Sequence, residues 1–247
     1  IIKPFIIAEL SANHNGEIKN IYKLIDKAKK CGASAVKIQS YTPQSMTLNC
    51  KNKYFFINKG PWAGKYLYDL YKKGTTPYSW HKKIFDYAKK KKILCFSSPF
   101  DSEAVDLLEK MKVKLYKIAS FEINHIPLLE KVGKTQKPVI ISTGMADIKD
   151  VRLAVKTLKK SGSTDIAILH CISSYPSKPE NYNLNFINKL KKFKLPIGLS
   201  DHTIGDIVAI SSVGMGVRIF EKHFKLDGQN GLDTKFSTNH IGFKKYV

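Results

Sequence analysis

Short apolar segments alternate with amphipathic segments along nearly the whole chain. Each apolar segment has the length and composition of a buried strand, whereas the amphipathic segments repeat apolar residues every three or four positions, as helices packed on a sheet do. The predicted strands are Phe5–Glu9, Ala35–Gln39, Ile93–Ser97, Leu115–Ile118, Val139–Ser142, Ile166–His170, Ile197–Ser200 and Arg218–His223. The clearest predicted helices are Lys19–Lys30, Trp80–Lys91, Asp101–Met111, Ile148–Lys160 and Leu184–Phe193. This order predicts a parallel sheet covered by helices.

A (β/α)8 barrel, the TIM-barrel fold of the α/β class, is the predicted architecture. Eight strand–helix units in 247 residues match the strand number and the usual length of this barrel. An open, doubly wound sheet is the alternative, but no GxGxxG motif follows the first strand to support it. We expect residues 1–247 to form one catalytic barrel with a long insertion at about 40–78.

The formal charge of +22 raises the question of a nucleic-acid partner. Only two basic residues are arginines, Arg152 and Arg218, whereas base and phosphate recognition favours arginine. We therefore expect no nucleic acid, and a positive field that favours an anionic substrate. The four cysteines show no metal-ligand spacing. Since the sequence has no membrane-spanning or signal-peptide pattern, we expect a cytoplasmic protein that has no membrane partner.

Polar side chains follow every predicted strand, on the side where the active sites of this fold lie. Burying neutral polar groups without partners costs about 1–3 kcal/mol each. So many polar groups around one opening therefore indicate a bound ligand or metal ion. The polar residues at this rim are Glu9, Asn13, His14, Lys37, Gln39, Ser97, Ser98, Lys117, Ser120, Glu122, Ser142, Thr143, His170, Ser173–Tyr175, Ser200, Asp201, His202, Glu221 and His223.

Two histidines, His202 and His223, stand at the ends of the last two predicted strands. Neighbouring strands would bring both imidazoles together, and two imidazoles with a carboxylate or water can hold a divalent first-row metal ion. The alternative is a pair of hydrogen-bonded histidines with no metal. Asp201, Glu221 and Glu9 nearby favour the metal.

Two lysines, Lys37 and Lys117, lie within apolar strand segments. Surrounded by serine hydroxyls, they indicate a cradle for a phosphate and a carboxylate, because lysine supplies the charge and hydroxyls supply directed donors. A Schiff base, as in class I aldolases, is the alternative.

Two segments carry further expectations. The insertion Tyr41–Tyr78 is rich in aromatic residues, which predicts either a lid or wall of a sugar pocket, or a small satellite core. After His223, a loop leads into the start of an eighth helix, so we expect the native chain to continue beyond residue 247.

Eight short motifs, in order, resemble the sialic acid synthase family, which condenses phosphoenolpyruvate with an amino sugar. These motifs are FIIAELSANHNG, AVKIQSYTP, LCFSSPF, YKIASFE, VIISTGM, HCISSYP, GLSDHTIG and EKHF. The resemblance implies a (β/α)8 barrel with a divalent ion, Mn²⁺ or alternatively Mg²⁺ or Co²⁺, on His202 and His223. It implies catalytic roles for Glu9, Lys37, Lys117 and these two histidines, with Glu9 near the metal and its water. It implies phosphoenolpyruvate contacts from Lys37, Ser98, Lys117, Ser120, Ser142, Ser173 and Ser200, and sugar contacts from Gln39, Glu122, Tyr175 and Asp233.

Departures from the family pattern qualify this resemblance. Ser173 replaces the asparagine of some members, and the chain lacks the family's C-terminal antifreeze-like domain, which implies a homodimer only for the full-length protein. Within the family, LYDLYKKGTTPYSWH and KIASFE are most similar to the pseudaminic acid synthases, which use 2,4-diacetamido-2,4,6-trideoxy-L-altrose. An N-acetylneuraminate or legionaminate synthase is the nearest alternative. More distant ones are a class I aldolase and a non-catalytic barrel that binds a phosphorylated metabolite.

Overall fold

Eight parallel strands close into a barrel in the computed structural model, which describes residues 3–247. Going round the barrel, the order is β1-β10-β9-β8-β7-β6-β5-β2, and the ring closes because β1 pairs with both β10 and β2. The barrel strands are β1 (Phe5–Glu9), β2 (Ala35–Ser40), β5 (Leu94–Pro99), β6 (Tyr116–Ile118), β7 (Val139–Ser142), β8 (Ile166–Cys171), β9 (Ile197–Asp201) and β10 (Ile219–His223). The predicted (β/α)8 barrel is confirmed, with strand boundaries that differ by one or two residues.

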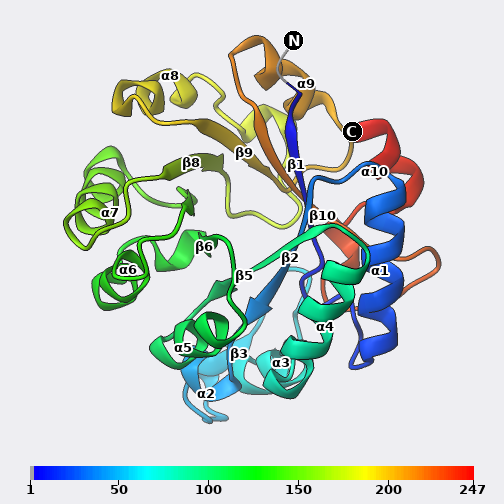
Figure 1. The fold of residues 1–247 in the computed structure, drawn as a ribbon. Coiled ribbons are helices and arrows are strands. Elements are labelled where there is room, and N and C mark those ends of the chain that lie inside the picture. Colours follow the sequence, from blue (N-terminus) through cyan, green and yellow to red (C-terminus); the bar gives the residue numbers. More distant parts are fainter. Residues whose placement is uncertain (1–2) are drawn as a thin grey trace.

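Helices surround this ring of strands (Figure 1). They are α1 (Ile18–Lys30), α4 (Tyr78–Lys90), α5 (Ser102–Lys110), α6 (Ile126–Gly133), α7 (Ile148–Lys160), α8 (Phe186–Leu190), α9 (Ile207–Gly214) and α10 (His240–Tyr246). The predicted helix Leu184–Phe193 is shorter, because a 3-10 turn replaces its end at Lys191–Phe193. Helix α6 is not among the helices predicted above. Between residues 3 and 247, no helix has the length and apolar character needed to cross a bilayer.

Alternation along the strands sorts side chains between two cores. The larger core lies between strands and helices and contains, for example, Ile6 and Ala8 of β1. The smaller core fills the barrel and consists of Ile7, Ala35, Phe96, Ile140, Ala167 and Leu169. Two residues further along β1, β2 and β7, on the same inward side, stand Glu9, Lys37 and Ser142. The barrel is therefore apolar inside and polar at its C-terminal mouth.

Gly198 of β9 shows how tightly this interior is filled. A Cβ atom there would lie 2.3 Å from Leu169 Cδ2 and 2.6 Å from the carbonyl oxygen of Ile219. Real Cβ atoms do not approach that closely, so glycine is required where β9 passes between β8 and β10. This packing holds the strand that ends at Ser200 and Asp201.

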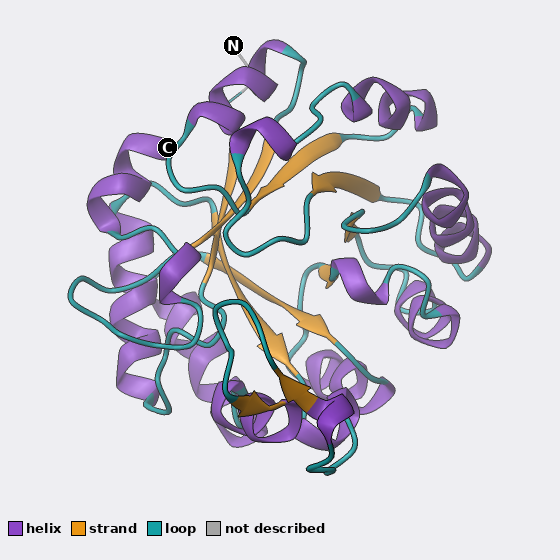
Figure 2. Ribbon diagram, turned by 180° about the vertical axis from the view of Figure 1, so that it is seen from behind, coloured by secondary structure: helices purple, strands orange, loops and turns teal. Residues whose placement is uncertain are grey.

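The segment between β2 and α4 forms a separate small unit outside the ring of strands (Figure 2). It contains α2 (Pro43–Met46), a hairpin of β3 (Phe56–Ile57) and β4 (Lys65–Tyr66), and α3 (Leu67–Gly74). None of these elements is predicted above: the strands have two residues each and show no periodic pattern, and α2 and α3 lie in a segment predicted only as an aromatic-rich insertion. We call residues 41–77 the β2–α4 segment.

Candidate active site

Four buried charged side chains, linked by ion pairs, lie at the mouth of the barrel. Glu221 Oε1 lies 3.1 Å from Lys37 Nζ and 3.2 Å from Lys117 Nζ, while Lys37 Nζ also lies 3.2 Å from Glu9 Oε2. The side chains of Lys37, Glu221 and Lys117 are only 5%, 4% and 2% exposed. Two carboxyl groups face two ammonium groups, which allows all four to stay inside the protein. Burial raises the pKa of Glu9 to about 7, although Lys37 opposes this.

The pKa values follow from this arrangement. Burial alone would raise the pKa of Glu221, but Lys117 and Lys37 outweigh it and lower that pKa to about 2. Burial works against the charged form of Lys37 as well, yet Glu221 and Glu9 outweigh it and raise the pKa of its ammonium group. For Lys117 burial wins, with Lys37 adding repulsion, and its pKa is lowered although Glu221 opposes this. Lys117 is thus the less compensated of the two cations.

Glu9 connects these four charged side chains to a second set of polar side chains. Gln39 Nε2 donates to Glu9 Oε1 at 3.1 Å and approaches Ser11 Oγ at 3.4 Å. Ser11 Oγ in turn donates to Asp233 Oδ2, which also accepts from the backbone amide of Ala12 at 3.2 Å. Asp233 lies far along the chain, after β10, and burial raises the pKa of its carboxyl group. The predicted sugar contacts Gln39 and Asp233 therefore lie on one side of the mouth.

Hydroxyl groups surround the lysines. Ser98 Oγ lies 3.4 Å from Lys37 Nζ, and Ser200 Oγ donates to Glu221 Oε1 at 3.3 Å. Ser142 Oγ and Ser173 Oγ are buried and have no hydrogen-bond partner among the described residues. Unpartnered buried hydroxyls carry a desolvation cost that a bound anion would remove.

Gly144 allows the loop after β7 to pass close to two serine side chains. Its φ angle of +49° lies in the left-handed region, and a Cβ atom there would meet Ser120 Cβ at 2.3 Å and Ser173 Oγ at 2.8 Å. Only glycine leaves room for the loop after β7 to pass so close to Ser120 and Ser173. Ser120 Oγ itself donates to Cys171 Sγ at 3.2 Å.

The two candidate metal ligands converge as expected from neighbouring strands. The ring centroids of His202 and His223 are 5.4 Å apart. His202 Nδ1 lies 2.9 Å from the carbonyl oxygen of Ile172, which leaves Nε2 free to bind a metal, while His223 Nδ1 is buried without a partner. Burial lowers the pKa of His223 far below its usual value, with His202 adding to the effect, so its imidazole is neutral.

These imidazoles fit a metal ion as two donors of a larger set. Within residues 3–247, no group of three or more His, Cys, Asp or Glu side chains is arranged to hold a metal ion. Neutral imidazoles suit first-row divalent ions, and the remaining ligands would come from substrate or water.

Glu122 and Tyr175 follow β6 and β8, two strands that both neighbour β7. Glu122 belongs to a 3-10 turn at Ser120–Glu122, its Oε2 is buried without a partner, and burial raises its pKa to about 7. Tyr175 packs against His202 with ring centroids 4.4 Å apart. Every candidate residue is thus found around the same opening.

The sequence does not predict the presence or the contacts of several residues at the mouth. Glu221 is predicted only as a neighbour of His223, whereas it faces both lysines. Cys171 lies 3.9 Å from His202 Nδ1, and Trp62 and Phe236 pack beside Tyr175. The period of two along β8 and β10 could have placed Cys171 and Glu221 inside the barrel. The aromatic-rich insertion is expected to form a lid or wall of a sugar pocket, or a satellite core, but no sequence signal distinguishes Trp62 from its other aromatic residues.

Two other histidines after strands have structural roles. His14 Nε2 lies 3.3 Å from the carbonyl oxygen of Gly74, which links the loop after β1 to α3. His170 Nε2 lies 2.6 Å from the carbonyl oxygen of Tyr182. Burial lowers the pKa of both imidazoles.

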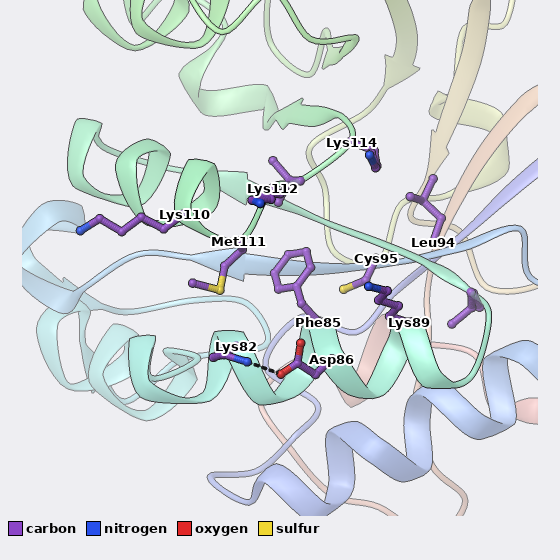
Figure 3. A pocket seen from close by; sticks show the side chains of 12 residues that line it. Lys82, Phe85, Asp86, Lys89, Leu94, Cys95, Lys110, Met111, Lys112 and Lys114 are labelled. Atoms are coloured by element: carbon purple, nitrogen blue, oxygen red, sulfur yellow. Dashed lines mark hydrogen bonds and ion pairs between the residues drawn. The ribbon is translucent and has the colours of Figure 1, made fainter.

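A cavity of about 520 Å³ lies away from this mouth, between α4 and the end of α5 (Figure 3). Phe85 and Met111 face it, and lysines such as Lys82, Lys89 and Lys110 stand around it. It contains none of the candidate residues. The convergence of charges and hydroxyls, rather than cavity size, therefore identifies the candidate site.

Comparisons with known proteins agree with this geometry. The model of the NeuB family matches residues 24–247. Pseudaminic acid synthase of Campylobacter jejuni is 44% identical over 247 residues, which cover 99% of this chain and 72% of that protein. Pseudaminic acid synthase of Helicobacter pylori is 43% identical over 246 residues, with 99% and 72% covered. The crystal structure of N-acetylneuraminic acid synthetase from Leptospira borgpetersenii superposes with a TM-score of 0.89 at 32% identity, covering 99% of this chain and 81% of that one.

Proposed function

This chain belongs to the NeuB family, and from that membership we propose that it is a pseudaminic acid synthase. It condenses phosphoenolpyruvate with 2,4-diacetamido-2,4,6-trideoxy-L-altrose and releases phosphate. We propose that the reaction takes place in the cytoplasm. The observation that carries it is the Lys37–Glu221–Lys117 cluster, held among hydroxyls beside two imidazoles at the mouth of a barrel.

In this proposal, different residues bind the two substrates. Lys37 and Lys117 bind the carboxylate and phosphate of phosphoenolpyruvate, and the serine hydroxyls orient these groups. Gln39, Glu122, Tyr175 and Asp233 hold the open-chain sugar with its aldehyde towards the enol carbon. Holding two reactants in register supplies several kcal/mol, up to roughly 7–11 kcal/mol in ideal systems. The serines that take part are Ser98, Ser120, Ser142, Ser173 and Ser200.

The chemistry then follows in balanced steps. C3 of phosphoenolpyruvate forms a bond to the aldehyde carbon, whose oxygen takes up a proton and becomes a hydroxyl. Water adds to the cationic C2 and passes a proton to Glu9. The C2 hydroxyl gives up its proton as the bond between C2 and the phosphate oxygen breaks, so the new keto group forms and phosphate leaves with its bridging oxygen and that proton. Lys37 and Lys117 stabilise the negative charge on the departing phosphate.

NeuB-family synthases are generally metal-dependent. We propose that His202 and His223 hold that ion and that it is Mn²⁺. Bound there, a divalent ion supplies Lewis acidity next to the aldehyde. The neutral imidazole of His223 and the fixed Nδ1 of His202 are the features that support this assignment.

A coupled assay of phosphate release tests the function. Purified protein with phosphoenolpyruvate and Mn²⁺ is expected to release phosphate only when the sugar is added, and mass spectrometry is expected to detect a nine-carbon acid. A panel containing N-acetylmannosamine and the legionaminate precursor separates the neighbouring activities. Phosphate release without sugar, or a borohydride-trapped adduct of Lys117 with pyruvate, would contradict the proposal.

A further inference from the structure

An aromatic wall stands beside the two imidazoles, and one member comes from the β2–α4 segment. Trp62 lies 5.8 Å from Tyr175 and 5.8 Å from Phe236, measured between ring centroids. Tyr175 and Phe236 are 5.0 Å apart, and Phe236 lies 4.9 Å from His223. Three segments far apart in the sequence thus place aromatic rings in one continuous layer.

Resting on the proposed function, we propose that Trp62 selects the acceptor sugar by contacting the methyl group at C6. A sugar with its aldehyde at the imidazoles extends past Tyr175 with its far end, C4 to C6. Trp62 is the next ring in that direction. An indole face favours a methyl group there over a hydroxymethyl group, because the hydroxyl would lose water without gaining a partner.

The setting of Trp62 fits a binding surface better than a core. Its Nε1 donates to the carbonyl oxygen of Leu232 at 2.9 Å, next to Asp233, which fixes the indole beside a predicted sugar contact. The side chain is only half-buried, and it also lines a separate cavity of about 300 Å³ that contains none of the candidate site residues. A satellite core would enclose the ring, whereas here the ring is fixed and still accessible.

The size of the effect follows from the chemistry of one carbon. A methyl group in an apolar pocket contributes roughly 10- to 200-fold to discrimination between substrates. In Trp62→Ala, the preference in kcat/KM for the 6-deoxy acceptor over its 6-hydroxy counterpart, the same sugar with a hydroxymethyl group in place of the methyl group, is expected to fall about tenfold or more. KM for phosphoenolpyruvate is expected to stay unchanged. Trp62→Phe keeps an aromatic face and is expected to retain most of the preference.

Fluorescence gives a second readout that does not depend on turnover. Trp62 and Trp80 are the two tryptophans of the chain, and Trp80 packs on His14. In Trp80→Phe, titration with the reduced form of the 6-deoxy sugar is expected to change the emission of Trp62 in a saturable way. In Trp62→Phe, the emission of Trp80 is expected to stay constant. Tyr54→Ala, in the same segment but 79% exposed, is the matched control for kinetics.

The outcomes separate this inference from the proposed function. If the wild type condenses the 6-deoxy sugar but Trp62→Ala keeps the same preference, the role of Trp62 is refuted and the function stands. A constant emission of Trp62 on saturation with the sugar refutes that role in the same way. If only 6-hydroxylated hexosamines are condensed, the proposed function and the selection of a methyl group both fail. A rise in both KM values with an unchanged preference indicates a structural role and also refutes the inference.

Discussion

Replacing Glu221 by glutamine removes the charge at the centre of the buried cluster. Glu221 Oε1 is shared by Lys37 at 3.1 Å and Lys117 at 3.2 Å, and all three side chains are at most 5% exposed. The amide keeps the shape of the carboxylate but leaves two ammonium groups without their common partner. Removing one member of a buried ion pair costs about 3–5 kcal/mol, because a charge then stays buried uncompensated.

The expected loss in the free energy of unfolding is one such penalty rather than two. Lys37 still faces Glu9 at 3.2 Å, so Lys117 is the cation left alone. We expect the free energy of unfolding of E221Q to be about 3–5 kcal/mol lower than that of the wild type, measured by urea denaturation at pH 7 with circular dichroism as the signal. S200A is the matched control, because Ser200 donates a neutral hydrogen bond to the same oxygen and its loss costs about 1 kcal/mol.

A double-mutant cycle with K117M decides whether the charge is responsible. If Lys117 is stranded in E221Q, removing its charge as well recovers part of the lost stability, and the two effects are not additive. Strict additivity, or a loss in E221Q no larger than that in S200A, would refute the idea that these charges hold one another inside the barrel.

Four further substitutions test individual residues. H202A and H223A are each expected to lose bound Mn²⁺, measured by elemental analysis, together with activity, measured by phosphate release. The control H170A is expected to keep its metal. Full metal content in both H202A and H223A would reject the ligand assignment. K37M is expected to weaken phosphoenolpyruvate binding, measured by calorimetry, about 10- to 100-fold, since a charge-assisted hydrogen bond contributes about 1.5–3 kcal/mol. Unchanged affinity would exclude a role of Lys37 in binding phosphoenolpyruvate. For Glu122, burial raises the pKa from 4.5 to about 7, so the wild type loses up to about 3 kcal/mol of stability as pH rises through that window. E122Q escapes this loss, and a stability difference between the two proteins that is constant from pH 4.5 to 7 would disprove it.

Much of the site follows from strand periodicity alone. Glu9 stands two residues after Ile7 and Lys37 two after Ala35, so an apolar barrel interior places both at the mouth. The order of the strands then makes β1 and β10 neighbours, which places Glu9 opposite His223. These steps need only local pattern and the closure of the barrel.

Pairing across the barrel could not be predicted in the same way. That Glu221, and not Asp201, faces Lys37 and Lys117 depends on side-chain direction, since Asp201 instead pairs with Lys222 at 2.9 Å on the other side of the strand. Trp62 reaches the mouth through a loop whose path depends on a hairpin of two-residue strands and one hydrogen bond to Leu232. Neither leaves a periodic trace in the sequence.

The balance of charges at the mouth bears on how an anion can bind there. Without a ligand, Glu9 and Glu221 compensate Lys37 and Lys117 in a place where isolated ammonium groups would give up their protons. A phosphate or carboxylate that enters must therefore compete with protein carboxylates for the same Nζ atoms. Lys117 has a single acidic partner, shares it with Lys37 and has a lowered pKa, so it gains most from a second anion. The cluster thus serves two needs at once, because it compensates both cations in the folded protein without a ligand and leaves one of them, Lys117, incompletely compensated for the substrate.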